Sequence, residues 1–307
     1  MFNVYIIYMN KIKSTFTIRD LENLTGIKAH TIRIWEKRYN VLQPVRTETN
    51  VRLYDTHSLQ KLLNINTLNT FGYKISNIAK MPEDKLPAMV KEILSGKTEN
   101  NHVISNFKLA MVNFDQHLFT DTYNSLLKSK TFSDIFYDCF LPLLREIGEL
   151  WQTETITPAH EHFISCLIKQ KIAVNTEVAL AKKAEYSGRV YVLYLPEGEV
   201  HEIGLLFINY ELLARGYQTI YLGESIPVQS LNDLNAHFDS ITFITYFTVE
   251  PSSGEAVGRY MDTIKETLLN QDATELMLFG RNAHNATKSG ETQIKTFINI
   301  KDFTNTL

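Results

Sequence analysis

The chain has 307 residues, of which 44% are hydrophobic and 21% charged, so it is long enough for two or three domains and apolar enough to pack them. Its 13 glycines and 8 prolines exclude a collagenous or low-complexity protein. Cys139 and Cys166 stand far apart and form no C-x-x-C pair. This spacing excludes a disulfide framework and a cysteine-built zinc site, and it favours a reducing cytoplasm.

The net charge of −3 hides an uneven distribution. Between Lys11 and Lys80 there are 12 basic and 5 acidic residues, a net of +7, so the rest of the chain carries −10. This split is expected where one end of a chain meets a polyanion, although a solvated basic surface would give the same count. No run approaches the roughly 18 apolar residues of a membrane span, and Met1–Met9 lacks the features of a signal peptide. We therefore expect a cytoplasmic protein without a membrane partner; a translation start at Met9 is a further hypothesis.

A helix-turn-helix is predicted near the start of the basic region. Two helical patterns, 17–24 and 28–39, flank Gly26, which suits the tight turn between them. Thr17 is placed to cap the first helix. The apolar positions around the second helix are expected to be buried: Ile27, Ile32 and Trp35.

Shorter elements follow the second helix. Pro44 is expected to end it, and the alternation of residues 45–54 predicts a small hairpin, or wing. Asp55 predicts the start of a helix through residue 68, and another helix begins at 74–79. The polar residues 97–101 are the best linker in the chain.

The remaining residues predict two further domains. Residues 102–183 repeat apolar side chains at spacings of three and four, which indicates a four-helix bundle. Five β-rich runs separated by helix-like stretches then predict an open parallel sheet: residues 190–195, 219–222, 241–247, 275–279 and 294–300. The expected fold is multidomain, with an α winged helix-turn-helix head (14–81), a four-helix bundle (102–183) and an α/β Rossmann-like, flavodoxin-like domain (188–307).

The head resembles the MerR family of transcription regulators over residues 16 to about 81. The resemblance rests on the turn glycine, the run Thr31-Ile-Arg33, the pair Trp35-Glu36 and the wing sequence Arg52-Leu-Tyr54. It implies a homo-oligomer, a dimer or a tetramer, on a near-palindromic double-stranded DNA operator. Glu36 is expected to form an ion pair. Because a helix in the major groove presents its N-terminal residues to base edges while cations contact phosphates, the candidates form two groups: His30, Thr31 and Arg33 for the groove, and Lys37, Arg38, Arg46, Arg52 and Tyr54 for the DNA backbone.

A second motif, Glu199-x-His201-x-x-Gly204, follows the first strand of the predicted sheet. A histidine in such a loop lies where ligands bind, although a lone histidine there is more often a hydrogen-bonded loop residue. The motif is similar to that of cobalamin-binding Rossmann-like domains, and the similarity spans most of residues 188–305. It implies that His201 is the cobalt ligand, that Glu199 fixes the tautomer of the imidazole, and that Gly204 leaves room for the displaced nucleotide tail.

Two later positions depart from the cobalamin-binding pattern. Thr245-Tyr-Phe247 stands in place of Ser-x-Leu and preserves a hydroxyl, while Gly280-Arg281 stands in place of Gly-Gly. Thr245 and Gly280 remain candidate cofactor contacts. Arg281 would crowd the nucleotide tail or pair with its phosphate.

The predicted bundle carries a third motif: Trp151, nine intervening residues, then Glu161-His162. It resembles the Trp-x9-Glu-His motif of light-sensing cobalamin regulators of the CarH and LitR type, in which the helical domain caps the upper face of the cofactor. A tryptophan offers a flat apolar wall, and Glu and His can hydrogen-bond an adenosyl group. Without the His201 motif, Trp151 would be assigned to the core and His162 to the surface. Light-sensing members carry His after the tryptophan, where this chain has Gln152; His160 is a conjectural substitute.

These resemblances predict a DNA-binding transcriptional repressor, not an enzyme, that binds cobalamin, with adenosylcobalamin the expected form and light or cofactor supply the signal. Two alternatives stay open. One is a regulator of the same architecture that has lost cobalamin binding and responds to a protein partner; Gln152 and Arg281 favour it. The other is the corrinoid carrier of a methyltransferase or mutase, in which a basic head would have no role. A metal-sensing regulator is least favoured, because two lone cysteines cannot form a thiolate site.

Overall fold

The computed structural model describes residues 15–94, 100–181, 186–269, 273–280, 283, 286 and 292–307. Three features of the sequence lie outside these ranges: the possible start at Met9, residues 97–99 of the expected linker, and Arg281. The chain divides into two compact units, Met1–Leu167 and Ile168–Leu307. Each unit is described by itself below.

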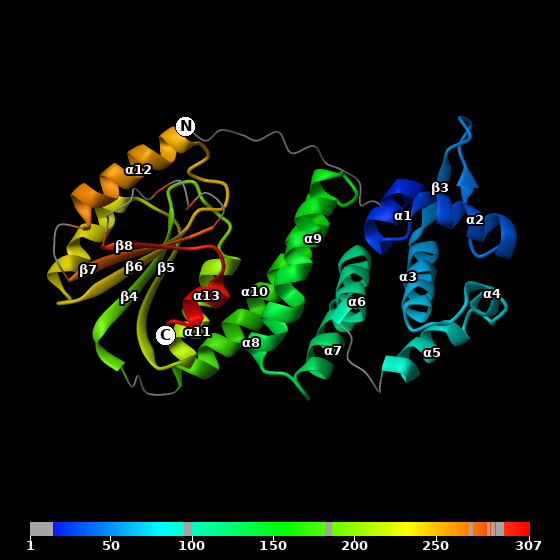
Figure 1. Cartoon of the computed structure of the whole chain (residues 1–307), viewed down its shortest axis with the longest axis horizontal. Helices are drawn as coiled ribbons and strands as arrows, with labels where there is room; N and C mark the ends of the chain where they lie inside the picture. Colours follow the sequence, from blue (N-terminus) through cyan, green and yellow to red (C-terminus); the bar gives the residue numbers. More distant parts are fainter. Residues whose placement is uncertain are drawn as a thin grey trace. The chain divides into compact units, whose positions relative to one another are not determined.

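The first unit begins with β1 (Thr15–Thr17) and the pair α1 (Ile18–Thr25) and α2 (Ala29–Tyr39) (Figure 1). Thr17 and Asp20 cap α1 reciprocally, and Gly26 ends it at φ 75°, which confirms the predicted cap and turn. Helix α2 ends at Tyr39, where the predicted helical pattern also ends. Asn40, at φ 51°, terminates it before Pro44 is reached, because asparagine tolerates the left-handed region where the chain must turn.

The wing and the following helices complete the head. Strands β2 (Val45–Arg46) and β3 (Arg52–Asp55) form the predicted hairpin, and the unpredicted β1 pairs with the other edge of β3 in an antiparallel sheet of order β1-β3-β2. Asp55 caps α3 (Thr56–Thr70). The helix expected at 74–79 is a single turn, α4 (Ile75–Ile78), and the unpredicted α5 (Lys85–Leu94) packs on α3, so helical structure that contacts the head extends beyond residue 81.

The predicted bundle is confirmed within residues 100–181. Its helices are α6 (Asn100–Asn113), α7 (Gln116–Leu126), α8 (Phe132–Ile135), which continues through a π-helical turn (Phe136–Phe140) into α9 (Leu141–Gln152), and α10 (Pro158–Leu180). Asn100 and Asn101, expected in the linker, belong to α6. Stacked and tilted aromatic rings fill the interior, with the centroids of Phe107, Phe119 and Phe140 between 5.0 and 5.9 Å apart.

Buried polar groups join the head to the bundle inside the first unit. Lys108 of α6 is 9% exposed, and its Nζ donates to the carbonyl of Leu24 in α1 (2.9 Å) and to Glu146 Oε2 on α9 (2.8 Å). Asn23 Nδ2 donates to Thr155 Oγ1 (3.0 Å). A cavity of about 540 Å³ lies beside these contacts. The helix-turn-helix is thereby hydrogen-bonded to the turn between α9 and α10.

The second unit carries a five-stranded parallel sheet of order β5-β4-β6-β7-β8. In chain order this is 2-1-3-4-5, so the predicted flavodoxin-like arrangement is confirmed. Strand β4 comes first in the chain among these five, and it has β5 on one side and β6 on the other. The topological switch point therefore lies between the ends of β4 and β6. The strands are β4 (Tyr186–Pro196), β5 (Tyr217–Ile226), β6 (Ile241–Tyr246), β7 (Thr274–Phe279) and β8 (Ile294–Phe297).

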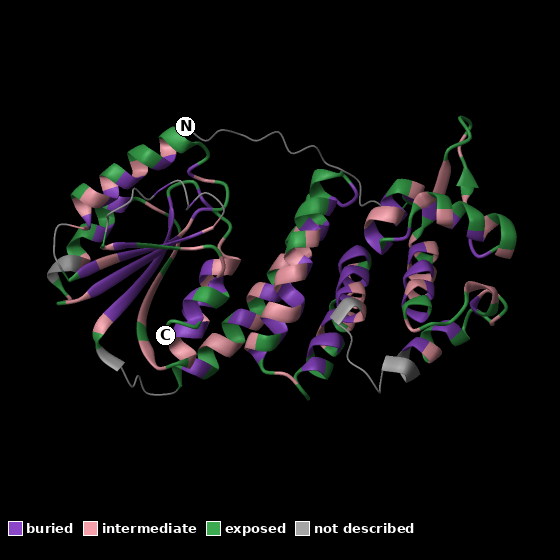
Figure 2. Ribbon diagram, in the orientation of Figure 1, coloured by how far each residue is buried: buried purple, intermediate pink, exposed green. Residues whose placement is uncertain are grey.

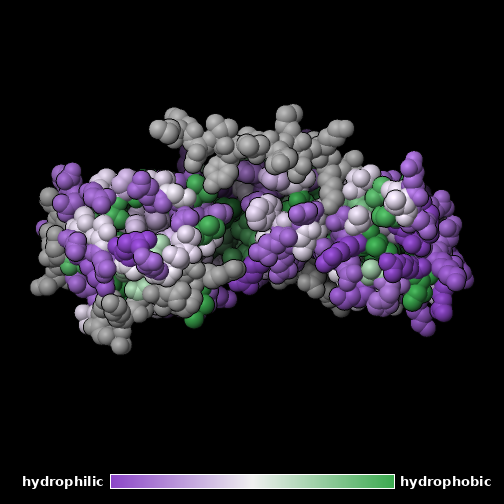
Figure 3. All heavy atoms as spheres, turned by 90° about the horizontal axis from the view of Figure 1, so that it is seen from above, coloured by the Kyte–Doolittle hydropathy of each residue, from purple (hydrophilic) through white to green (hydrophobic). Residues whose placement is uncertain are grey.

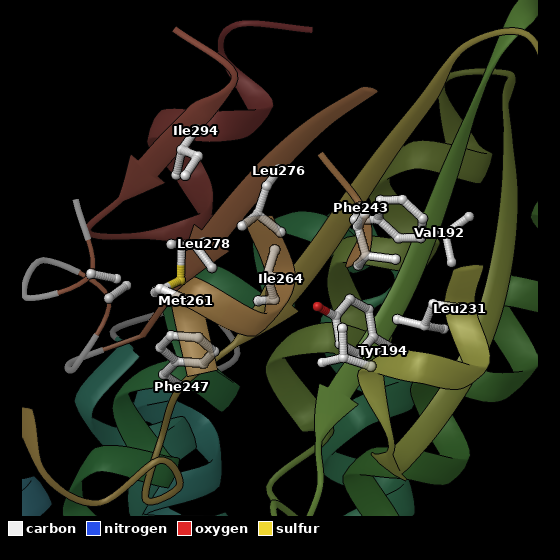
Figure 4. Packing of buried hydrophobic residues seen from close by; sticks show 14 of the residues in the cluster. Val192, Tyr194, Leu231, Phe243, Phe247, Met261, Ile264, Leu276, Leu278 and Ile294 are labelled. Atoms are coloured by element: carbon white, nitrogen blue, oxygen red, sulfur yellow. The ribbon is translucent and has the colours of Figure 1, made fainter. Parts of the chain in front are cut away.

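Helices cover both faces of this sheet (Figure 1). Helices α11 (Ile203–Ala214) and α13 (Ile300–Thr304) lie on one face; α12 (Gly254–Thr267) and the 3-10 helix η2 (Val228–Ala236) lie on the other. Figure 2 shows that the central strands are largely buried, as expected when both faces are covered. On the α12 face, Tyr194 and Phe243 of the strands pack with Leu231, Met261 and Ile264 (Figure 4).

Candidate functional site

The second helix of the helix-turn-helix presents a basic surface. Along α2, the side chains of His30, Arg33, Lys37 and Arg38 are exposed and Thr31 is half-buried. Ile32 and Trp35 are buried on the opposite side at 0% and 8% exposure, so the predicted core positions are confirmed. The head's surface drawn in Figure 3 is mostly hydrophilic. Exposed cations on one face of a helix suit contact with a nucleic acid backbone.

A glutamate of α1 fixes the start of α2. Glu22 Oε2 accepts the N–H of Ala29 (3.1 Å), one of the donors that a helix start leaves unpaired, and Glu22 Oε1 lies 3.1 Å from Lys28 Nζ. The hydrogen bond from Lys28, followed by that from Ala29, lowers the pKa of Glu22. The two helices are therefore joined by the Gly26 turn and also by a side-chain cap.

The wing is tied to α2 by Glu36, which forms the expected ion pair. Arg52 Nε donates to Glu36 Oε2 (3.0 Å), and the Tyr54 hydroxyl donates to Glu36 Oε1. Arg46 is exposed near the wing turn, where it donates to Asn50 Oδ1 (2.5 Å). Glu36 thus sets the position of the wing relative to the basic helix.

Tyr54 does not lie where a phosphate contact needs it. Its side chain is 1% exposed, its ring is in the core of the head, and burial followed by the hydrogen bond to Glu36 raises its pKa. The strand β1, which sequence reasoning missed, places Phe16 directly opposite Tyr54 and covers it. We therefore replace the expected backbone contact with a positioning role for Tyr54.

The Glu199–His201 loop lies at the switch point of the parallel sheet. It follows the carboxyl end of β4, next to the loop that follows β6. Ligands of open α/β sheets bind in this crevice. The sequence-predicted motif therefore falls at the place in the fold where a ligand is expected.

Glu199 is buried and joins the two loops. Its Oε1 accepts the backbone N–H groups of Val200 and His201 (both 2.9 Å) and lies 2.5 Å from His201 Nδ1. Its Oε2 accepts three successive N–H groups across the crevice, those of residues 248, 249 and 250, at 3.2, 2.7 and 2.9 Å. Burial by itself would raise the pKa of Glu199, but the hydrogen bonds from His201 and from the backbone outweigh it and lower the pKa to about 2.

His201 is held in one orientation yet remains accessible. Its side chain is 47% exposed, whereas that of Glu199 is 1% exposed. With Nδ1 bonded to the carboxylate, Nε2 is the nitrogen with which the imidazole would bind a metal, and the carboxylate makes that nitrogen more basic. An accessible imidazole nitrogen held in this way can serve as a single protein ligand to a metal ion.

The other candidates of this domain surround the same crevice. A Cβ on Gly204 would lie 2.8 Å from Tyr246, and one on Gly280, at φ 98°, would lie 2.2 Å from the carbonyl oxygen of Phe247, so both glycines are required by close approach. Thr245 is fully buried, and in the described part of the chain its hydroxyl has no hydrogen-bond partner. An unpaired buried hydroxyl at this position fits a polar ligand.

An ion-pair network beside His201 was not anticipated. Lys169, in the part of α10 that belongs to the second unit, lies 2.8 Å from Glu202 Oε1 and 3.7 Å from Glu224 Oε1. The Tyr221 hydroxyl donates to Glu202 Oε2 (2.7 Å). Burial raises the pKa of Glu202 but the bonds from Lys169 and Tyr221 prevail and lower it. Nothing in the sequence near Glu202 signals this network, because Lys169 is distant along the chain.

The bundle motif lies at one end of two helices. Trp151 is near the end of α9 and is 53% exposed, so the alternative of a core tryptophan is excluded, while Glu161 is half-buried and His162 exposed near the start of α10. His160 is not placed to replace the histidine that the light-sensing regulators carry at the position of Gln152. It is 1% exposed, lies 2.8 Å from Thr157 Oγ1 through Nδ1 and stacks on a phenylalanine ring.

Comparison with known proteins finds similarity in the head and in the helical bundle. Residues 16–85 match the model of the MerR HTH family regulatory proteins, and residues 103–175 match that of a B12 binding domain. The chain is 26% identical over 223 residues to the HTH-type transcriptional repressor CarH of Myxococcus xanthus, covering 71% of this chain and 73% of that protein. It is 27% identical over 219 residues to the repressor CarA of the same organism, covering 71% of each.

One solved structure shows a similar fold over two thirds of this chain. The monomethylamine corrinoid protein of Methanosarcina barkeri superposes with a TM-score of 0.55 at 16% identity, covering 68% of this chain and 98% of that one. At this identity the likeness concerns the fold alone. Among the described helices none is long and apolar enough to cross a membrane, and the described residues contain no group of three or more metal-ligating side chains.

Proposed function

We propose that this chain, a homologue of the CarH and CarA repressors that combines a MerR-type head with a B12-binding domain, is a transcriptional repressor that contacts double-stranded DNA through α2 and the wing and responds to a corrinoid bound through His201. One observation carries the proposal: the Glu199–His201 pair lies at the switch point of a parallel sheet in the same chain as an exposed basic helix. A corrinoid carrier would have no use for that helix, and this chain's homologues are repressors, not enzymes.

The residues have separate roles toward DNA. His30, Thr31 and Arg33 would contact base edges, and Lys37, Arg38, Arg46 and Arg52 would contact phosphates. Arg52 already bonds Glu36, so its guanidinium would bridge the helix and the DNA backbone. Tyr54 would act through Glu36 only.

The cofactor residues likewise divide by role. His201 would bind cobalt through Nε2, Glu199 would hold its ring, and Thr245 would hydrogen-bond the ligand, with Gly204 and Gly280 keeping the backbone close. We further propose Trp151, Glu161 and His162 as cofactor contacts, on the motif and on the exposure of the tryptophan. A bound adenosylcobalamin would supply a cobalt–carbon bond that light breaks.

Regulation requires that the two states of the protein bind the ligand and DNA with different affinities. We expect the chain with adenosylcobalamin to bind its operator as a dimer or tetramer and light to lower that affinity. Because Gln152 replaces the histidine of the light-sensing relatives and His160 is buried, the cobalt ligands after illumination are expected to differ from theirs.

The test is a spectrum of the purified full chain. Mixed with adenosylcobalamin in darkness and passed through a desalting column, the wild type should retain a corrinoid spectrum in about one equivalent. His201→Ala should lose it, whereas His237→Ala, which removes an exposed histidine elsewhere in the same domain, should keep it. Retention by His201→Ala would contradict the ligand assignment. A wild type without corrinoid would favour the regulator that responds to a protein partner.

A further inference from the structure

The ring of Tyr246 rests on the first turn of α11. Gly204 is the second residue of that helix and lies three residues after His201. A Cβ at Gly204 would lie 2.8 Å from Tyr246 Cε2 and 3.2 Å from both Cδ2 and Cζ. The space that the missing side chain leaves between α11 and β6 is therefore filled by an aromatic ring.

Neighbouring strands hold this ring in place. Tyr246, Phe279 and Phe297 are register partners at the ends of β6, β7 and β8. The first two rings stack at 6.0 Å and 17°, and the last two at 5.2 Å and 16°. Phe303 of α13 packs edge-on against Phe279 at 5.3 Å. The row of four aromatic rings lies on the face of the sheet that α11 and α13 cover.

The filled space lies where a complete cobalamin would need room. When a protein imidazole takes the lower position on cobalt, the nucleotide base tethered to that side of the corrin ring must lie elsewhere, beside the histidine. The crevice between the start of α11 and the end of β6 borders the His201 loop at the switch point.

We infer that Tyr246 closes this crevice and selects corrinoids by what their lower side carries: a tail-less cobinamide binds with the ring on Gly204, whereas complete cobalamin binds only after the ring has left. The inference rests on the proposed binding through His201. Because the closed arrangement is held by ring stacking, the fraction of molecules with an open crevice is small, and the apparent affinity for cobalamin falls by that fraction, roughly tenfold.

The experiment compares two ligands on the full chain. Adenosylcobinamide and adenosylcobalamin are titrated in darkness and followed by absorbance, and the ratio of their dissociation constants is the readout. The ratio of cobalamin to cobinamide should be about ten for the wild type. Tyr246→Ala should bring it to about one by tightening the binding of cobalamin alone. Tyr246→Phe is the matched control and should leave the ratio at ten, since the ring and not the hydroxyl fills the space.

Each outcome decides the inference. A ratio near one in the wild type, or a ratio that Tyr246→Ala leaves unchanged, overturns it while leaving corrinoid binding intact. Failure of the wild type to bind either corrinoid overturns the proposed function and this inference with it. A thermal melt checks that Tyr246→Ala is folded; if it is not, Tyr246→Leu, which is smaller but still apolar, is expected to lower the ratio and replaces it.

Discussion

A glutamate organises each of the two candidate sites, half-buried in the head and buried in the α/β domain, but the groups that it leaves for binding differ. Glu36 joins the wing to α2 through Arg52 and Tyr54, and exposed cations lie around it on α2 and at Arg46 of the wing. Glu199 accepts hydrogen bonds from both loops of the switch point and fixes a single imidazole. If the proposed function holds, binding in the head would be a sum of many contacts, whereas binding in the α/β domain would depend on one nitrogen atom of His201. A single substitution is therefore expected to have a larger effect in the α/β domain than in the head.

The largest effect is expected for Glu199→Ala. The change leaves the N–H groups of residues 248–250 without their acceptor and releases His201, so we expect a loss of about 3 kcal/mol of stability and about 10- to 100-fold of corrinoid affinity. Denaturant unfolding and dark titration with adenosylcobalamin measure the two effects. Glu197→Ala removes an exposed acid from the same loop and should change neither. If the two variants had equal stability and equal corrinoid affinity, the assigned role of Glu199 in holding His201 would be wrong.

The dependence of stability on pH tests the role of the Glu199 carboxylate separately. The pKa of Glu199 is lowered from 4.5 to about 2, so its carboxylate stabilises the folded state above pH 4.5, and this contribution is lost as the pH falls from there through about 2. Glu199→Gln should therefore be less stable than the wild type at pH 7, and the difference should shrink between pH 4.5 and 2. Unfolding midpoints at several pH values check this. A difference that stays constant down to pH 2 would contradict the assigned role of the carboxylate.

A smaller effect is expected from any one cation of the head. Arg33→Ala should weaken binding to a specific duplex by about 1–3 kcal/mol, roughly five- to 150-fold, without changing stability, because the side chain is exposed. The duplex is obtained by selection from a random pool, and affinity is measured by gel shift at physiological salt. Arg259→Ala, an exposed arginine of the other unit, is the control. Unchanged affinity in Arg33→Ala would count against the groove assignment.

The smallest effect tests the reassignment of Tyr54. Tyr54→Phe removes only the hydroxyl that donates to Glu36, so it should cost about 1 kcal/mol of stability and change DNA affinity little. If Tyr54 contacted a phosphate instead, affinity would fall by a similar factor at both salt concentrations, because the neutral hydroxyl displaces no counterion. Thermal melting and gel shifts at two salt concentrations separate these results.

Local patterns predicted much of this molecule. Thr17 capping α1, Gly26 ending it, and Glu199 holding His201 all involve residues within a few positions of one another, where propensity and side-chain reach decide the outcome. The five parallel strands also followed from alternating composition. The main error in the head concerned Tyr54, which lies beneath β1. This strand is short and its sequence does not predict it, so the alternating pattern of the wing gave no indication that Tyr54 is buried.

Contacts between distant segments were not predictable from the sequence. The second oxygen of Glu199 bonds residues about fifty positions away, Tyr246 packs on Gly204, and Lys108 reaches the carbonyl of Leu24. Each of these depends on which elements become neighbours. The motif could locate the proposed cobalt ligand, but only the fold shows that an aromatic ring fills the space between α11 and β6.

The most direct test of the account is the affinity of the full chain for its selected duplex with adenosylcobalamin, measured in darkness and again after green light. We expect light to weaken binding at least tenfold in the wild type and to have no effect on His201→Ala. Equal affinity in darkness and after light in the wild type, with corrinoid bound in both samples, would contradict the claim that the α/β domain controls the head through the corrinoid.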